Sequence, residues 1–225
     1  KHEFPDGFIR SIRNSFSPRS EREFESALMF EGASVPVVNY AGWGNKGSEC
    51  VLLSRTLENA SNAHSIWFDS ASLYPATREA YIRSFSRFLK LFLSSRIFHP
   101  DFHLGNLMVK NDLSEFYIVD PYGAALKSSG LTQEQKFELY KIVGAMRGEL
   151  SFYDAATVLI SAGMEAYIDA AITLWEKIIR AEAQEMENLW EKRKDQVLSG
   201  NSKYCLKNTR GENTYYVRKS MSGIP

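Results

Sequence analysis

The sequence has few of the features that mark disulfide-stabilised or membrane-spanning chains. Its 225 residues include two cysteines, Cys50 and Cys205, and no CxxC pair, which argues against a zinc knuckle or a redox dithiol. Two isolated cysteines fit a reducing compartment, where we expect each to be a small buried hydrophobe. No apolar run approaches the roughly 20 residues that span a bilayer, and the N-terminal residues lack signal-peptide character. We therefore expect a cytoplasmic protein.

An excess of one charge is also lacking, since 27 Lys and Arg residues balance 27 Asp and Glu residues. A net charge of zero argues against bulk electrostatic binding to DNA or RNA, so we expect no nucleic-acid partner. Internal repeats and low-complexity tracts are missing as well. The sequence is 44% hydrophobic over 225 residues, which suffices to bury a sizeable core without staples.

Hydrophobic patterning predicts strands and one helix at the front of the chain and almost only helices behind. A Ser-Pro start and Gly32 bound a predicted helix over residues 18–31. Strands are predicted over 35–40 and 50–54, joined as a hairpin by a turn at 42–47. Helical spacing follows from residue 77, and again from 131 to 198, with two short strands at 107–109 and 116–119 between them. This order predicts an α+β layout with two lobes of unequal size.

The last predicted helix, over residues 165–198, carries a stripe of apolar side chains at helical spacing. The stripe consists of Ile168, Ile172, Trp175, Ile179, Met186, Leu189 and Trp190. A cofactor-binding box would have this spacing, but a stripe facing the core is the simpler interpretation and the one adopted here. The tail after residue 199 breaks the helix, and residues 215–217 are predicted to form one more strand.

The residues suited to chemistry gather in one stretch. It reads His99-Pro100-Asp101-Phe102-His103-Leu104-Gly105-Asn106, and Asp120 follows a predicted hairpin. Phosphoryl transfer needs a carboxylate that orients and deprotonates the acceptor hydroxyl, and hard oxygen ligands that hold Mg²⁺ on the nucleotide phosphates. The catalytic loop of protein kinases has the same Asp-to-Asn spacing, followed by a metal-binding Asp. The stretch therefore predicts a phosphotransfer site.

Two other interpretations of this stretch stay open. His99, Asp101 and His103 alternate along the chain, as three ligands of Zn²⁺ or Fe²⁺ on a strand face would, which would suit a metal-dependent oxygenase. That set leaves Asn106 and Asp120 unexplained, whereas the phosphotransfer interpretation uses both. A structural loop without chemistry is the remaining alternative.

These motifs resemble the catalytic and metal loops of the protein-kinase-like superfamily, in the variant seen in small-molecule and atypical kinases. The subgroup resembled most is the bacterial lipopolysaccharide kinases, which phosphorylate Kdo or heptose of the inner core. Residues 17–24 with 32–36, residues 50–57 and residues 139–154 carry this closer resemblance, which spans roughly residues 1–180. It implies a bilobal kinase fold with a small N-lobe over 1–58, a helical C-lobe over 59–198 and a tail over 199–225.

The resemblance also implies the ligands and the partners. It implies that the protein uses ATP and Mg²⁺ and transfers the γ-phosphate to a hydroxyl, with a glycolipid core sugar as the favoured acceptor. A lipid-linked acceptor would bring the protein into peripheral contact with the inner membrane. The resemblance gives no oligomeric state.

Individual residues take roles from the resemblance. Asp101 matches the catalytic base, and Asn106 and Asp120 match the Mg²⁺ ligands. Glu23 matches the helix Glu that pairs with a phosphate-binding Lys, for which Lys1 stands at the corresponding place; the alternative for Glu23 is a solvent-exposed acid. The remaining assignments are adenine contacts at Arg55, Thr56 and Leu57 and loop support from His99, His103 and Gly105.

The sequence departs from the kinase pattern in two places. No Gly-rich phosphate loop is present, and we expect it to precede Lys1. Asp120-Pro121-Tyr122-Gly123 stands where protein kinases have Asp-Phe-Gly. The sequence shows no activation-loop phosphosite, which favours a sugar or small-molecule kinase over a regulated protein kinase. An atypical Ser/Thr kinase, an aminoglycoside-like small-molecule kinase and a pseudokinase scaffold remain alternatives, although the intact Asp101, Asn106 and Asp120 argue against the last.

Overall fold

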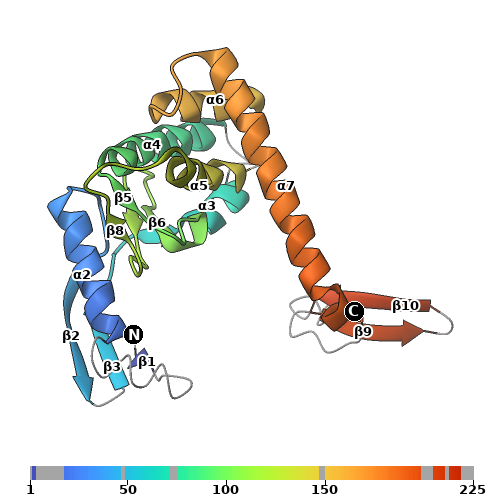
Figure 1. The fold of residues 1–225 in the computed structure, drawn as a ribbon, viewed down its shortest axis with the longest axis horizontal. Coiled ribbons are helices and arrows are strands. Elements are labelled where there is room, and N and C mark those ends of the chain that lie inside the picture. The colour runs from blue at the N-terminus through green and yellow to red at the C-terminus, as the bar shows by residue number, and fades with distance from the viewer. Residues whose placement is uncertain are drawn as a thin grey trace. The chain divides into compact units, whose positions relative to one another are not determined.

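The chain divides into two compact units, residues 1–178 and 179–225. The computed structural model describes residues 2–3, 18–46, 49–70, 75–146, 150–198, 205–210 and 213–218. Its elements are small antiparallel sheets and helices, which confirms the mixed helix-and-strand class that the sequence predicts (Figure 1). The boundaries expected at residues 58 and 198 stay predictions. No helix of the described ranges is both long and apolar enough to cross a membrane.

The first sheet of unit 1 holds the front of the chain. Strands β2 (Tyr40–Lys46) and β3 (Glu49–Ser54) form an antiparallel hairpin, and β1 (His2–Glu3) pairs with the other edge of β3. Helix α2 (Arg19–Gly32) lies beside this sheet (Figure 1) and buries one face through Ala27 and Phe30. Cys50 of β3 is buried and unpaired, as predicted.

The strand predicted over 35–40 and the turn predicted over 42–47 are wrong. The segment before Tyr40 is extended but forms only one isolated bridge, from Val37 to Ile118, because Pro36 has no N–H to offer a ladder. The glycine-rich stretch after Tyr40, which reads as a turn, is instead the edge strand β2. Cross-strand pairing with β3 therefore outweighs local sequence preference.

The second sheet of unit 1 contains the hairpin that follows residues 99–106 and leads to Asp120. Strands β6 (Leu107–Lys110) and β7 (Phe116–Ile118) form the predicted hairpin, and β4 (Ala60–Asn62) adds to the free edge of β6. Ile118 N donates to Pro36 O at 3.1 Å and Val38 N donates to Ile118 O at 2.9 Å. The segment after α2 is thus bonded directly to the strand that leads into Asp120.

Helices cover this sheet and form the core. In chain order they are α3 (Ala63–Ser70), α4 (Pro75–Ser94), α5 (Gln133–Gly144), α6 (Phe152–Ser161) and the start of α7 (Ile168–Leu198). The short strand β5 (Ile97–Phe98) follows α4 and pairs with β8 (Ala125–Leu126). The aromatic side chains of α4 are buried. Phe92 stacks on Phe102 with ring centroids 4.3 Å apart and on Phe30 at 5.9 Å. One aromatic cluster therefore supports α2, α4 and the loop that contains Phe102 together.

The stripe predicted to face the core along 165–198 holds only in part. Trp175 is buried together with Ala171, Leu174 and Ile178, whereas Ile168 is exposed. The predicted members beyond residue 179, Met186, Leu189 and Trp190, are exposed, so the core-facing interpretation is wrong for that part of α7. In unit 2 the predicted strand at 215–217 lies within β10 (Asn213–Arg218), which pairs with β9 (Cys205–Arg210).

Candidate active site

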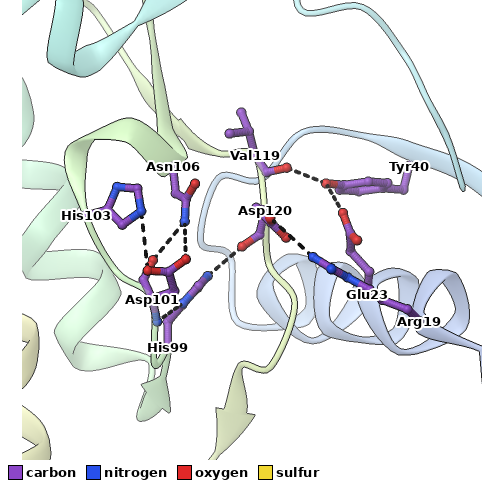
Figure 2. A network of polar contacts seen from close by, with 9 residues as sticks. All are labelled: Arg19, Glu23, Tyr40, His99, Asp101, His103, Asn106, Val119 and Asp120. Carbon is purple, nitrogen blue, oxygen red and sulfur yellow. Dashed lines mark hydrogen bonds and ion pairs between the residues drawn. The ribbon is translucent and has the colours of Figure 1, made fainter. Parts of the chain in front are cut away.

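The loop between β5 and β6 is held in shape by contacts between Asp101 and Asn106. A short 3₁₀ turn, η1 (Leu104–Asn106), brings the end of the loop back to its start. Asn106 Nδ2 donates to Asp101 O at 3.0 Å and to Asp101 Oδ2 at 3.2 Å (Figure 2). Because both contacts use the amide nitrogen, the amide oxygen Oδ1 points to the other side of the group. The five-residue spacing thus presents an exposed carboxylate and an amide oxygen next to each other.

His103 occupies the inside of this turn. Gly105 N donates to His103 Nδ1 at 3.0 Å, so a neutral imidazole carries its proton on Nε2, which faces Asp101 Oδ1 at 3.4 Å. A Cβ on Gly105 would lie 2.9 Å from His103 Cε1. A residue with a side chain at position 105 would therefore clash with the imidazole ring. His103 and Gly105 contact each other within the loop, and their role in supporting it stays a prediction.

His99 connects this loop to the segment that holds Asp120. Its side chain is only 2% exposed. His99 Nδ1 accepts from Asp101 N at 3.1 Å, and Nε2 lies 2.7 Å from the carbonyl oxygen of Asp120. A backbone N–H can only donate and a carbonyl can only accept, so His99 is neutral with its proton on Nε2. One imidazole thereby fixes Asp101 and Asp120 relative to each other.

Acidification is expected to destabilise the protein through His99. Burial lowers the His99 pKa below its usual value, and the nearby carbonyl and carboxylates offset this only in part. The unfolded chain then binds the proton more readily than the folded one, so stability falls as the pH drops below about 6.5. Urea unfolding of wild type and His99→Gln at several pH values between neutral and mildly acid would measure this contribution.

The control for this experiment is His64→Gln, because His64 is an exposed histidine in the same unit. His64→Gln should keep the wild-type loss of stability on acidification, whereas His99→Gln should show a smaller loss. Equal pH dependence in wild type and His99→Gln would contradict the assignment of a neutral His99.

Asp120 lies between the catalytic loop and α2. Figure 2 shows its carboxylate facing Arg19, with Arg19 Nη2 3.8 Å from Asp120 Oδ2. Val119 N donates to Asn106 O at 3.1 Å, which ties the approach to Asp120 to the end of the catalytic loop. After Asp120 the chain turns, and the Tyr122 ring lies 4.5 Å from the Arg19 guanidinium carbon.

Tyr40 and Glu23 complete the same network from the first sheet and α2. Tyr40 Oη donates to Val119 O at 2.7 Å and lies 3.5 Å from Glu23 Oε1 (Figure 2). Burial raises the Tyr40 pKa strongly, and the carboxylates of Glu23 and Asp120 raise it further, so the phenol keeps the proton that it donates. Glu23 is 2% exposed, so the alternative of a solvent-exposed acid is wrong.

Removing the Tyr40 hydroxyl is expected to destabilise the protein. Tyr40→Phe deletes the donor to Val119 O inside a part-buried network, which typically costs about 1–2 kcal/mol of unfolding free energy. Denaturant unfolding of Tyr40→Phe beside Tyr153→Phe would measure this cost. Tyr153 is 78% exposed and should tolerate the same change. Equal stability of the two variants would contradict the role of the Tyr40 hydroxyl.

The structure brings most of the predicted site residues together, but not all. Asp101, Asn106, Asp120 and Glu23 lie in the one network of Figure 2 together with His99 and His103. Lys1 lies outside the described residues. The segment of Arg55, Thr56 and Leu57 follows β3, and the Arg55 N–H already donates to Asn39 O at 2.8 Å. The adenine-binding role of this segment stays a prediction.

Three residues of the site were missed by sequence reasoning. Tyr40 and Arg19 reach the Asp120 segment from distant parts of the chain, and no local pattern indicates such contacts. Asn62 ends β4 and precedes α3; its Oδ1 accepts from His64 N at 3.0 Å, and its Nδ2 donates to Gly105 O at 2.9 Å. An Asn before a helix is a recognisable cap signal, but its second contact with the catalytic loop is not.

The metal-triad interpretation of the histidines is wrong. Both ring nitrogens of His99 are engaged within the protein, and His103 Nδ1 accepts from Gly105. Among the described residues no group of three or more His, Cys, Asp or Glu side chains is placed to hold a metal ion. The donors that do suit a metal are the Asn106 amide oxygen and the Asp120 carboxylate, hard oxygen ligands of the kind that Mg²⁺ takes alongside phosphate oxygens.

Comparison with known proteins gives a match of structure but none of sequence. No family model and no curated protein matches the chain. The solved structure of WaaP in complex with acyl carrier protein is similar in fold, with a TM-score of 0.59 and 12% sequence identity. The match covers 76% of this chain and 76% of WaaP. The chain therefore shares its fold with WaaP over about three quarters of its length.

Proposed function

We propose that this protein is an ATP- and Mg²⁺-dependent phosphotransferase that places the γ-phosphate on a hydroxyl. The observation that carries the proposal is the placement of Asp101 and Asp120 by His99, together with the contact that holds Asn106 to Asp101 (Figure 2). The exposed Asp101 carboxylate is itself held by Asn106 and His103, which supports a chemical role for it. The similarity in fold to WaaP supports the same proposal.

The residues divide the work as follows. Asp101 orients the acceptor hydroxyl and takes its proton as the oxygen bonds to phosphorus and ADP departs. Asn106 Oδ1 and the Asp120 carboxylate would hold Mg²⁺, which when bound neutralises charge on the phosphates. Glu23 would pair with Lys1 at the phosphates, and the backbone of residues 55–57 would hold adenine. In this proposal the small and large lobes of a bilobal kinase meet near residue 58.

The acceptor we favour is a sugar of the lipopolysaccharide inner core, Kdo or heptose. This rests on the resemblance of residues 17–24 with 32–36, residues 50–57 and residues 139–154 to lipopolysaccharide kinases, and it is supported by the similarity in fold to WaaP. A lipid-linked acceptor would bring the protein to the inner membrane from the cytoplasmic side.

The test is transfer of labelled γ-phosphate from MgATP to dephosphorylated rough-type lipopolysaccharide by the full-length protein. Label in the glycolipid is expected, and it should depend on Asp101. Label in a protein or a small-molecule acceptor instead would keep the phosphotransferase and change its substrate class. Absence of nucleotide turnover with every acceptor would contradict the proposal and favour a pseudokinase scaffold.

A further inference from the structure

A cleft of about 380 Å³ lies between α2 and the turn after Asp120. One wall is a face of α2 formed by Arg22, Glu25, Ser26 and Met29, and the other wall is the segment Tyr122, Gly123 and Ala124. The phosphotransfer chemistry proposed above uses none of these side chains. A cleft of this size accommodates a small organic ligand.

Arg22 is the cationic group of this cleft, and its charge is not neutralised locally. Its guanidinium carbon lies 5.3 Å from the Tyr122 ring centroid, and that of Arg19 lies 4.5 Å from the same centroid. Arg19 Nη2 forms an ion pair with Asp120 Oδ2 at 3.8 Å. Arg22 has no acidic partner within the described ranges, and its Nε is buried there without a hydrogen-bond acceptor. Because Nε is shielded, a ligand in the cleft would meet the guanidinium at its Nη groups.

The remaining side chains of the cleft indicate what the rest of the ligand would contact. Glu25 stands one turn from Arg22, yet the two form no ion pair with each other. The Ser26 hydroxyl already donates to Arg22 O at 2.8 Å. Met29 and the Tyr122 ring offer apolar surface. The cleft therefore suits an oxyanion at the guanidinium attached to a compact carbon skeleton.

We propose that this cleft binds a phosphate-bearing ligand, with the phosphate on the Nη groups of Arg22. The planar fork of a guanidinium matches two phosphate oxygens, so the two Nη groups donate in parallel. A phosphate seated there would link α2 to the turn after Asp120. This inference goes beyond the proposed function, because it concerns binding and not transfer.

The experiment follows the Nε–Hε resonance of Arg22 by nuclear magnetic resonance during titration with inorganic phosphate and with glucose 6-phosphate. The protein is full-length and nucleotide-free, so an inactive kinase would not affect the result. Both phosphates are expected to shift the resonance with saturation, whereas glucose and sodium chloride at matched ionic strength are not. Tighter binding of glucose 6-phosphate would assign an organophosphate, and equal binding would assign phosphate itself.

Two substitutions make the prediction specific. Arg22→Gln should weaken binding, followed through the neighbouring amide signals, by about tenfold or more, as expected for charge-assisted hydrogen bonds. Glu25→Gln should tighten it about threefold, because it removes a like charge from the cleft. The control is Arg83→Gln, an exposed arginine of α4 paired with Glu79, which should bind as wild type does. A shift produced equally by chloride, or binding indifferent to both cleft substitutions, would overturn the proposal.

Discussion

Replacing Asp101 with Asn is expected to lower phosphate transfer by about 10²–10⁴-fold while the fold stays intact. The substitution removes the carboxylate that would take the proton of the acceptor hydroxyl. It changes little else, because the side chain is 71% exposed and the Asp101 backbone contacts to Asn106 and His99 remain. Initial rates of labelled phosphate transfer, with unfolding curves for both proteins, would measure the two expectations together.

The neighbours of Asp101 explain why the Asn variant should fold but not work. The new amide oxygen accepts from Asn106 Nδ2 or from His103 Nε2, but not from both, because the other amide atom is a donor. The side chain therefore keeps one of two contacts. The matched control is Asp112→Asn in the β6–β7 turn, where the carboxylate accepts from Ser114 N at 2.9 Å. Equal loss in both variants, or transfer by Asp101→Asn near the wild-type rate, would contradict a catalytic base at this position.

The contacts at the centre of the site span few residues of the chain. A single 3₁₀ turn brings Asn106 next to Asp101. The β6–β7 hairpin then connects Asn106 to Asp120. Contacts over so few residues depend on local backbone geometry, which spacing and turn chemistry specify. This is why the sequence alone indicates that Asp101, Asn106 and Asp120 lie close together.

The surroundings of the site were not predictable in the same way. Tyr40 reaches Val119 across 79 residues, and the choice of this partner depends on how the first sheet and β7 come together. The strand prediction around residue 40 failed for a related reason. The pairing of β2 with β3 supplies hydrogen bonds that a glycine-rich sequence does not indicate. The residues that surround the site come from distant parts of the chain, and a single sequence carries little information about such long-range contacts.

The helix α7 gives a third case. Its apolar residues have helical spacing throughout, and the spacing correctly predicts a helix. Spacing cannot say how far a neighbour extends along a helix, so the stripe is buried at Trp175 and exposed at Met186 and Trp190. Periodicity identifies the face, whereas burial requires a partner for that face.

Replacing Asp120 with Ala is expected to remove metal-dependent nucleotide turnover, with a loss of more than about 100-fold. Even the outer partners of metal ligands typically contribute 10–100-fold, so loss of a ligand itself should cost more. The backbone should persist, because His99 bonds the Asp120 carbonyl and not its carboxylate. The measurement is nucleotide turnover as a function of Mg²⁺ concentration, together with Mn²⁺ binding followed by electron paramagnetic resonance in the presence of a non-hydrolysable ATP analogue.

A second variant separates loss of the metal ligand from loss of the ion pair with Arg19. Arg19→Gln removes the cation 3.8 Å from Asp120 but leaves the carboxylate. A guanidinium beside the carboxylate competes with a bound cation, so Arg19→Gln should lower the Mg²⁺ concentration needed for half-maximal turnover. If Arg19→Gln instead loses turnover as Asp120→Ala does, the ion pair and not the metal is what Asp120 provides. Turnover by Asp120→Ala near the wild-type rate would remove Asp120 from the metal site altogether.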